Sequence, residues 1–301
     1  MSEAIQAVSA PSGHVTSAIR EVLGVFKLRI GMMIMITALA GLAVTPGQPL
    51  SVLQWLVLAV SVFLSSASAG AFNQYYEYES DRLMARTRTR AFVTGSLAHS
   101  PIWLVIIVAL LLASVVATWF VINFASALFV FLGAFFYAIV YTVWLKRTTC
   151  LNIVVGGLAG SFAVLAGAAA VDPALGPLPL LLALVLFLWT PPHFWSLAIA
   201  NEADYRAAGV PMLPVIVGAK RAAHIVFVST IALFLASLLP AWFGAGPIYL
   251  TGAVLGGAYF LLKAFHLARS PSRKTALASF FASLIQLGLI LVAVGIEKIF
   301  L

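Results

Sequence analysis

The sequence predicts an all-α integral membrane protein, a bundle of about nine transmembrane helices. Its composition excludes a soluble globular domain: of 301 residues, 63% are hydrophobic and 9% are charged, and the mean hydropathy is +1.09. Its basic residues also alternate between the loops in step with the helices. We therefore expect a short cytoplasmic polar tail at 1–20 and a single transmembrane domain over 21–301.

Each expected span is an apolar stretch of about the 20 residues that a helix needs to cross the hydrocarbon core. Polar segments separate them, in order "TPGQPLS", the charged residues 73–90, "INF", "LKRTT", "VDPALGPLP", "NEADYRAAGVP", "FGAGPI" and "RSPSRK". Because the third and fourth stretches are separated only around Asn123, counts of eight or ten stay open. The expected spans are 22–44, 51–72, 101–121, 124–145, 152–171, 178–200, 222–243, 247–268 and 277–299.

The basic residues test this count independently, because cytoplasmic loops carry excess Lys and Arg. With nine spans, every basic residue except Lys298 falls at the start of the chain or near the loops that follow even-numbered spans. We therefore expect the N-terminus and the charged loops in the cytoplasm and the C-terminus outside. The formal net charge of +8 indicates this topology and contact with the lipid bilayer, and it does not indicate nucleic-acid binding.

The stretch "NQYYEYESDRLMARTRTR", residues 73–90, follows the second span and gathers many of the few charges. On a helix continuing from that span, Asn73, Glu77 and Asp81 recur every fourth residue, so they share one face and lie about 6 Å apart. Glu79 points elsewhere. Carboxylate and amide oxygens at a membrane edge suit Mg²⁺, which binds one or two carboxylates together with water and substrate phosphate.

An ordinary juxtamembrane charge cluster, in which these carboxylates pair with Arg82 or Arg86, is the alternative. A second acidic cluster favours the metal site. The segment "HFWSLAIANEADYRAAGVPMLP" places Asn201, Glu202 and Asp204 after the sixth span, on the same side of the membrane. Two acidic clusters with a surplus of Arg predict a pocket for a magnesium diphosphate.

Four cations are candidates to bind the diphosphate. Arg86 and Arg90 lie four residues apart, and each guanidinium can form bidentate hydrogen bonds with phosphate oxygens. The segment "YTVWLKRTT" adds Lys146 and Arg147 from a third charged loop. Basic residues that only anchor the cytoplasmic ends of helices are the alternative for each.

These motifs resemble the membrane-embedded prenyltransferases of the UbiA superfamily, whose signature is N-x-x-x-[DE]-x-x-x-D followed by an Arg-rich stretch. Asn73, Glu77, Asp81, Arg86 and Arg90 fit that signature. Within the superfamily, "YTVWLKRTTCLNIVVGGLAGSFAVLAG", "WTPPHFWSLAI" and "DYRAAGVPMLPVIVG" are similar to the protohaem IX farnesyltransferases.

The resemblance implies a UbiA-like bundle around a central cavity, in a bacterial inner membrane. It also implies a Mg²⁺-dependent reaction in which farnesyl diphosphate alkylates a vinyl group of haem b and water adds, giving haem O and diphosphate. A haem A synthase and terminal oxidase assembly proteins are implied partners. The implied catalytic residues are Asn73, Glu77, Asp81 and Asp204. The implied metal ligands are the same four residues and Asn201. The implied diphosphate contacts are Arg86, Arg90, Lys146 and Arg147.

Two features depart from the family pattern. Ala91 stands where the family usually has Pro, and the second motif offers Asn201 and Asp204 in place of a full aspartate set. Within the enzyme class, a prenyltransferase acting on another acceptor, a quinone or chlorophyll precursor, is one alternative. A secondary transporter that binds an anion at its helix ends is another, although it predicts charges near the bilayer midplane rather than at one boundary.

His193 in "TPPHFW" lies deep within the sixth span, where a polar side chain needs a partner. Haem iron accepts a histidine nitrogen as axial ligand, which makes His193 a candidate haem-binding residue. A hydrogen bond beside a helix break at Pro191 and Pro192 is the alternative. Both interpretations stay open.

Overall fold

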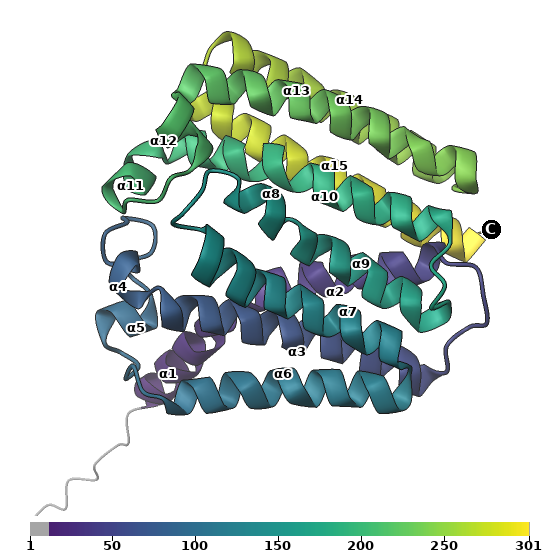
Figure 1. Cartoon of the computed structure of the whole chain (residues 1–301), viewed down its shortest axis with the longest axis horizontal. Coiled ribbons are helices and arrows are strands. Elements are labelled where there is room, and N and C mark those ends of the chain that lie inside the picture. Colours follow the sequence, from purple (N-terminus) through teal and green to yellow (C-terminus); the bar gives the residue numbers. More distant parts are fainter. Residues whose placement is uncertain (1–11, 301) are drawn as a thin grey trace, which may run out of the picture.

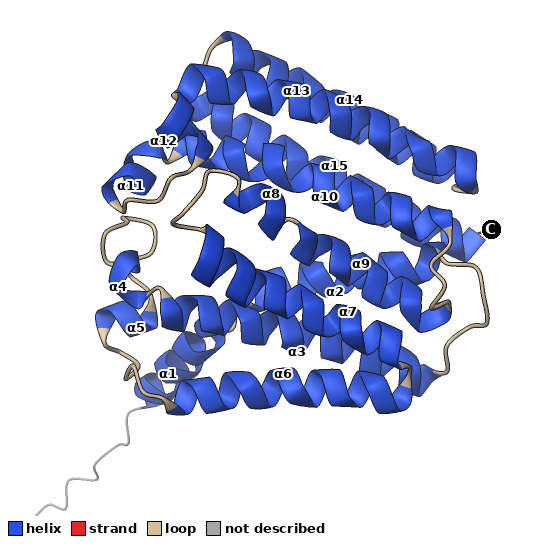
Figure 2. Cartoon of the chain, viewed as in Figure 1, coloured by secondary structure: helices blue, strands red, loops and turns tan. Residues whose placement is uncertain are grey.

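The computed structural model describes residues 12–300, with side chains from residue 19 onward, and every regular element in that range is a helix (Figure 2). Among the described residues, eight helices are long and apolar enough to cross a membrane, and the count is nine if the bent pair at the start forms one span. The described residues thus confirm the all-α membrane bundle. The first 11 residues of the predicted tail lie outside them, and the domain division stays a prediction.

The helices follow one another along the chain with short connections. Their bounds are α1 Ser12–Val25, α2 Leu28–Val44, α3 Val52–Tyr76, α4 Tyr78–Asp81, α5 Ala91–Thr94, α6 Ile102–Val121, α7 Phe124–Phe135, η1 Phe136–Leu145, α8 Asn152–Gly156, α9 Leu158–Val171, α10 Pro177–Ala200, α11 Glu202–Ala207, α12 Leu213–Val217, α13 Ala219–Leu238, η2 Leu239–Phe243, α14 Pro247–Arg269 and α15 Arg273–Phe300.

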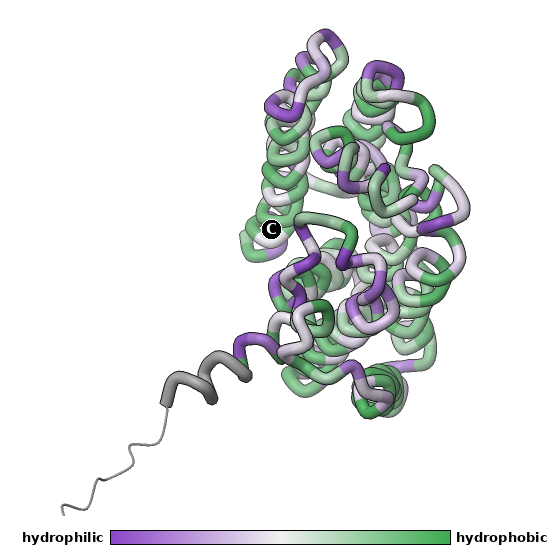
Figure 3. Tube along the Cα trace, turned by 90° about the vertical axis from the view of Figure 1, so that its left-hand side faces the viewer, coloured by the Kyte–Doolittle hydropathy of each residue, from purple (hydrophilic) through white to green (hydrophobic). Residues whose placement is uncertain are grey.

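The long helices lie side by side, and the short helices α4, α5, α11 and α12 gather at one end of the bundle (Figure 1). Within the bundle α2 packs on α9, α3 on α6, α10 on α13, and α14 on both α13 and α15. Figure 3 looks onto the end with the short helices, where hydrophilic stretches interrupt the hydrophobic trace. We call this the charged end. Because the spans are antiparallel neighbours, loops far apart in sequence meet there.

The outer faces of the spans are apolar, as a bilayer requires. Phe120 and Val52, for example, are 79% and 77% exposed. Inside, glycine allows backbones to approach closely: a Cβ on Gly41 of α2 or on Gly167 of α9 would overlap a backbone carbonyl of the facing helix. Small residues at helix interfaces are typical of membrane bundles, where packing drives association.

Two of the expected spans are not single continuous helices, and a third is continuous where a break was expected. The span at 22–44 is bent by 47° between α1 and α2, where Lys27 has a left-handed backbone with φ of 49°. The span at 152–171 is interrupted at Gly157, between α8 and α9. The predicted break at Pro191 and Pro192 is wrong, because α10 runs through both prolines. The φ that proline fixes is itself helical, so packing against α15 can keep α10 in one piece.

Candidate active site

The first motif lies at the junction of α3 and α4. α3 extends beyond the expected boundary at residue 72 and so includes Asn73, while Glu77 ends it. Glu77 N donates to Asn73 O at 3.1 Å and Asp81 N donates to Glu77 O at 2.9 Å, so the four-residue repeat crosses the junction. Asn73, Glu77 and Asp81 are 3%, 2% and 1% exposed, whereas the side chain of Glu79 is 63% exposed. The shared face that the spacing predicts is therefore a buried one.

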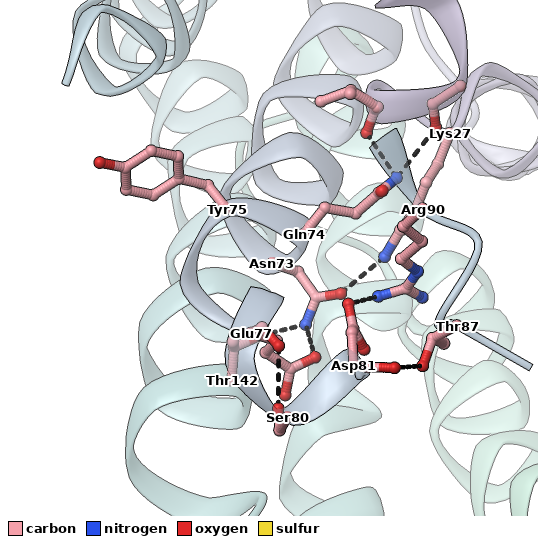
Figure 4. A network of polar contacts seen from close by, with 12 residues as sticks. Lys27, Asn73, Gln74, Tyr75, Glu77, Ser80, Asp81, Thr87, Arg90 and Thr142 are labelled. Atoms are coloured by element: carbon pink, nitrogen blue, oxygen red, sulfur yellow. Dashed lines mark hydrogen bonds and ion pairs between the residues drawn. The ribbon is translucent and has the colours of Figure 1, made fainter. Parts of the chain in front are cut away.

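A lysine that sequence analysis did not single out contacts this face. Lys27 Nζ donates to Asn73 Oδ1 at 2.7 Å (Figure 4). It also donates to the hydroxyl of Tyr137 at 3.2 Å. Asn73 Nδ2 in turn donates to Glu77 Oε2 at 2.7 Å and to Thr142 Oγ1 at 3.1 Å. The one available signal for Lys27 was its position as a charged residue within the first apolar stretch. Nothing in the sequence marked Tyr137 and Thr142 as site residues, because their contacts depend on the π-helical turn geometry of the fourth span.

Both carboxylates of the face are paired with cations. Lys146 Nζ lies 2.5 Å from Glu77, and Arg90 forms an ion pair with Asp81. Arg82 instead pairs with exposed Glu79 at 3.4 Å. The alternative in which Glu77 and Asp81 pair with Arg82 or Arg86 is therefore wrong, since their partners come from more distant positions.

One buried oxygen of this cluster has no protein partner. Among the described residues, Asp81 Oδ1 has no hydrogen bond, although its side chain is 1% exposed. A buried carboxylate oxygen without a partner is costly unless a ligand satisfies it. Together with the Glu77 carboxylate and the Asn73 amide, it supplies the hard oxygen atoms that fit Mg²⁺.

The winding of η1 brings the partners of Asn73 and Glu77 to this face. η1 is a ten-residue π-helix, and Lys146 N continues its spacing by donating to Tyr141 O, five residues earlier, at 2.9 Å. π-helical turns occur frequently at functional sites. Gly156 leaves room for η1, since a Cβ there would lie 2.8 Å from the Tyr141 ring. Burial lowers the pKa of Lys146 below its ordinary value, and the Glu77 carboxylate opposes that shift.

The second acidic cluster lies beside the first motif at the charged end. Arg86 lies over the ring of Tyr205 in α11, 5.9 Å from its centroid. Burial raises the pKa of Tyr205, and the Arg86 guanidinium opposes the shift. Asp204 is half-buried, and Glu202 pairs with Arg206 at 2.5 Å.

Asn201 uses its side chain locally, donating from Nδ2 to Leu197 O at 2.8 Å. Of the residues that the structure describes, no three Asp, Glu, His or Cys side chains converge on a common point. The two clusters therefore lie on the same end without sharing a carboxylate cage, and a metal site formed by both stays a prediction.

The four predicted diphosphate cations differ in their surroundings. Lys146 is 7% exposed and the Arg90 side chain is 20% exposed, and both contact the buried carboxylates. Arg86 and Arg147 are exposed. Sequence reasoning treated the four alike, because their burial depends on contacts between loops distant in sequence.

His193 lies buried between aromatic rings of α10 and α15. Its ring stacks on Trp189 at 4.1 Å and on Phe280 at 4.5 Å between centroids, and its Nδ1 lies 2.6 Å from Ser283 Oγ. The partner that a polar group in lipid needs is thus a serine of a neighbouring helix. Binding of haem iron by His193 stays a prediction.

Comparison with known proteins places these features in a family context. The model of the UbiA prenyltransferase family matches residues 34–285. The chain is 54% identical to protoheme IX farnesyltransferase 2 of Paramagnetospirillum magneticum, over 94% of this chain and 99% of that protein. It is 38% identical to protoheme IX farnesyltransferase 1 of Cenarchaeum symbiosum, over 93% of this chain and 96% of that protein.

Solved structures share the fold. A digeranylgeranylglyceryl phosphate synthase matches with a TM-score of 0.77 and 19% identity, over 95% of this chain and 100% of that one. A UbiA homolog from Archaeoglobus fulgidus bound to DMAPP and Mg²⁺ matches with a TM-score of 0.69 and 17% identity, over 91% and 98% of the two chains. The predicted UbiA-like fold is confirmed.

Proposed function

The chain belongs to the UbiA prenyltransferase family, and we propose that it transfers the farnesyl group of farnesyl diphosphate to a vinyl group of protohaem IX, with addition of water, to give haem O and diphosphate. One observation carries this assignment: 54% identity to a protoheme IX farnesyltransferase over nearly the full length of both chains. The buried cluster of Asn73, Glu77 and Asp81 with its cations supports it. An anion transporter is disfavoured, because this cluster lies at one end of the spans.

The reaction begins when the allylic C–O bond of farnesyl diphosphate breaks and its electron pair leaves with diphosphate. The vinyl π electrons of protohaem IX then form the new C–C bond, which leaves a cationic carbon beside the porphyrin. Water adds to that carbon and loses a proton. No oxidant or reductant is consumed, so the protein must stabilise the leaving anion and shelter the carbocation from early capture by water.

Fixed positive charges at the end of α3 are suited to the leaving anion. Arg90 and Lys146 are held in place by the carboxylates, and Arg86 lies over Tyr205 beside them. We assign diphosphate binding to these three and to Arg147. Charge-assisted hydrogen bonds to phosphate oxygens are strong, and preorganised cations need no rearrangement when the charge develops.

The same site fits Mg²⁺. Asp81 Oδ1 is buried without a partner, and Glu77 and Asn73 add oxygen atoms on the same face. We assign these three residues as ligands, with Asp204 and Asn201 of the second cluster. The bound ion supplies neutralisation of charge on diphosphate. The A. fulgidus homolog bound to DMAPP and Mg²⁺ supports this cofactor.

We further propose that His193 contributes to haem binding, that the charged end and the N-terminus face the cytoplasm of a bacterial inner membrane, and that a haem A synthase or oxidase assembly factor receives the product. The confinement of basic residues to alternate loops supports the orientation.

A labelling experiment tests this orientation. Cysteines placed at residues 82–90 and 203–209 in a Cys150→Ser background should react only with reagents that enter the cytoplasm. Labelling from outside would invert the topology.

The purified protein tests the activity directly. Incubation with protohaem IX, farnesyl diphosphate and Mg²⁺ should give a product with the mass of haem O, and Asp81→Asn should lower its rate of formation strongly. Glu79→Gln, on the exposed side of the same short helix, is the matched control and should retain it. Prenylation of an aromatic quinone precursor in place of protohaem IX would favour the alternative acceptor.

A further inference from the structure

α13 and α14 form one margin of the bundle, away from the Asn73 cluster (Figure 1). Two shallow hollows lie on this margin. One of about 570 Å³ at the start of α13 is lined by Lys220, Arg221, His224 and Ile225. The other, a groove of about 350 Å³, is lined by Phe227, Phe234, Ala258, Leu261, Leu262 and Phe265.

The polar hollow and the apolar groove follow one another along α13. Lys220, His224 and Phe227 lie at positions i, i+4 and i+7 of α13, which places them on one helix face. The ring of Phe227 contacts that of Phe265 on α14, with 5.6 Å between centroids. Arg269, one turn further along α14, lies over the Phe265 ring at 5.7 Å. Positive charge therefore lies beyond the Phe227 and Phe265 end of the apolar groove.

This surface carries positive charge without compensation. The sequence has no Asp or Glu between Asp204 and Glu297, and among the described residues no ion pair involves any of residues 220–274. We call this cluster the basic margin. Its exposed basic residues and histidines are Lys220, Arg221, His224, His266, Arg269, Arg273 and Lys274.

We propose that the basic margin binds an anionic phospholipid of the surrounding bilayer, with its phosphate at Lys220, Arg221 and His224 and an acyl chain in the groove between α13 and α14. Anchoring residues alone need neither a hollow nor an apolar groove below it. The lining residues of the polar hollow all belong to α13, and clusters of Lys and Arg beside a transmembrane helix attract anionic lipid headgroups. The lack of carboxylates favours a phosphodiester over a magnesium diphosphate, because carboxylates would have to hold the metal.

Native mass spectrometry of the detergent-purified chain tests the proposal, which does not depend on the proposed function. Dioleoylphosphatidylglycerol and dioleoylphosphatidylcholine are titrated separately, and the wild type should retain the anionic lipid preferentially. Each basic residue near an anionic surface is worth about fivefold in affinity, so Lys220→Gln with Arg221→Gln should weaken phosphatidylglycerol binding about 30-fold. Arg20→Gln, which removes an exposed charge on α1, is the control and should change little.

The groove is tested separately by filling it. Ala258→Phe should displace the acyl chain and weaken binding of the same lipid, whereas Val228→Phe, at a lipid-exposed position of α13 outside the groove, should not. Equal binding of the two lipids, or unchanged binding in the Lys220→Gln, Arg221→Gln protein, would overturn the proposal. So would stoichiometric displacement of the lipid by farnesyl diphosphate, which would identify a prenyl diphosphate as the occupant.

Discussion

Two groups of basic residues lie at the charged end, and their surroundings are opposite. Around α3, α4 and η1, Arg90 and Lys146 lie against buried carboxylates. In the basic margin, Lys220 and Arg221 are exposed and form no ion pair with the described residues. Both groups look alike in the sequence, where each is a set of Lys and Arg beside a hydrophobic span.

Burial decides what each group can do. A charge withdrawn from water needs a partner of opposite sign, so the charges around α3 are coupled to one another and to whatever ligand enters between them. An exposed cation at a membrane surface keeps its water and interacts with anionic lipid. The first group is therefore suited to chemistry and the second to membrane contact.

The largest expected effect follows from removing one partner of a buried pair. Lys146→Met should leave the Glu77 carboxylate buried and unpaired, and lower the free energy of unfolding by about 3–5 kcal/mol. Denaturant titration in micelles measures this loss. Glu77→Gln combined with Lys146→Met should recover much of the stability and no turnover, because no buried charge is stranded but the site is lost.

Exposed pairs sharpen this contrast. Arg206 pairs with Glu202 at the surface, with side chains 63% and 25% exposed, so Arg206→Met should cost less than about 1 kcal/mol. Equal losses in the Lys146 and Arg206 variants would show that burial does not separate the two kinds of pair.

The next effect concerns chemistry at the same face. Asp81→Asn keeps the size of the side chain but removes the charge of a proposed metal ligand, and turnover should fall about 100- to 1,000-fold in a folded protein, as when a preorganised electrostatic group is lost. Glu79→Gln, two residues away and exposed, should leave turnover near that of the wild type. Steady-state formation of haem O measures both. Similar losses in the two variants would contradict the separate faces of α4.

The outcome for this region shows what sequence could provide. The four-residue spacing of Asn73, Glu77 and Asp81 predicted their shared face, because helix geometry depends only on local sequence. The partners of those residues depend on packing between distant segments: Lys27 reaches Asn73 across a bend, and Lys146 reaches Glu77 from a π-helix. Neither the bend nor the π-helix leaves a signal in hydropathy. The expected break at the two prolines of α10 is wrong for the same reason, since packing against neighbouring helices decides whether a proline-containing span stays continuous.

A smaller effect separates the two substrates. Arg86→Gln should weaken farnesyl diphosphate binding about tenfold, because a neutral side chain loses a charge-assisted contact with phosphate, and should leave protohaem binding unchanged. His193→Ala should instead shift the protohaem absorption spectrum and spare farnesyl diphosphate affinity if its ring nitrogen ligates iron. An unchanged spectrum in folded His193→Ala protein would return His193 to a structural role with Ser283.

The smallest effect is expected in the basic margin. Lys220→Gln with Arg221→Gln removes two positive charges, the same number that loss of Arg90 and Lys146 would remove. The side chains of Lys220 and Arg221 are exposed, however, so their loss leaves no buried carboxylate unpaired. The free energy of unfolding in detergent should therefore change by less than about 0.5 kcal/mol, as for most surface substitutions, and haem O formation in micelles should match that of the wild type. In vesicles that contain phosphatidylglycerol the same variant should lose the extra thermal stability that the anionic lipid gives the wild-type chain, because a ligand that binds only the folded state stabilises it. A large loss of stability in detergent alone would mean that these cations have partners inside the protein, and the distinction between the two regions would fail.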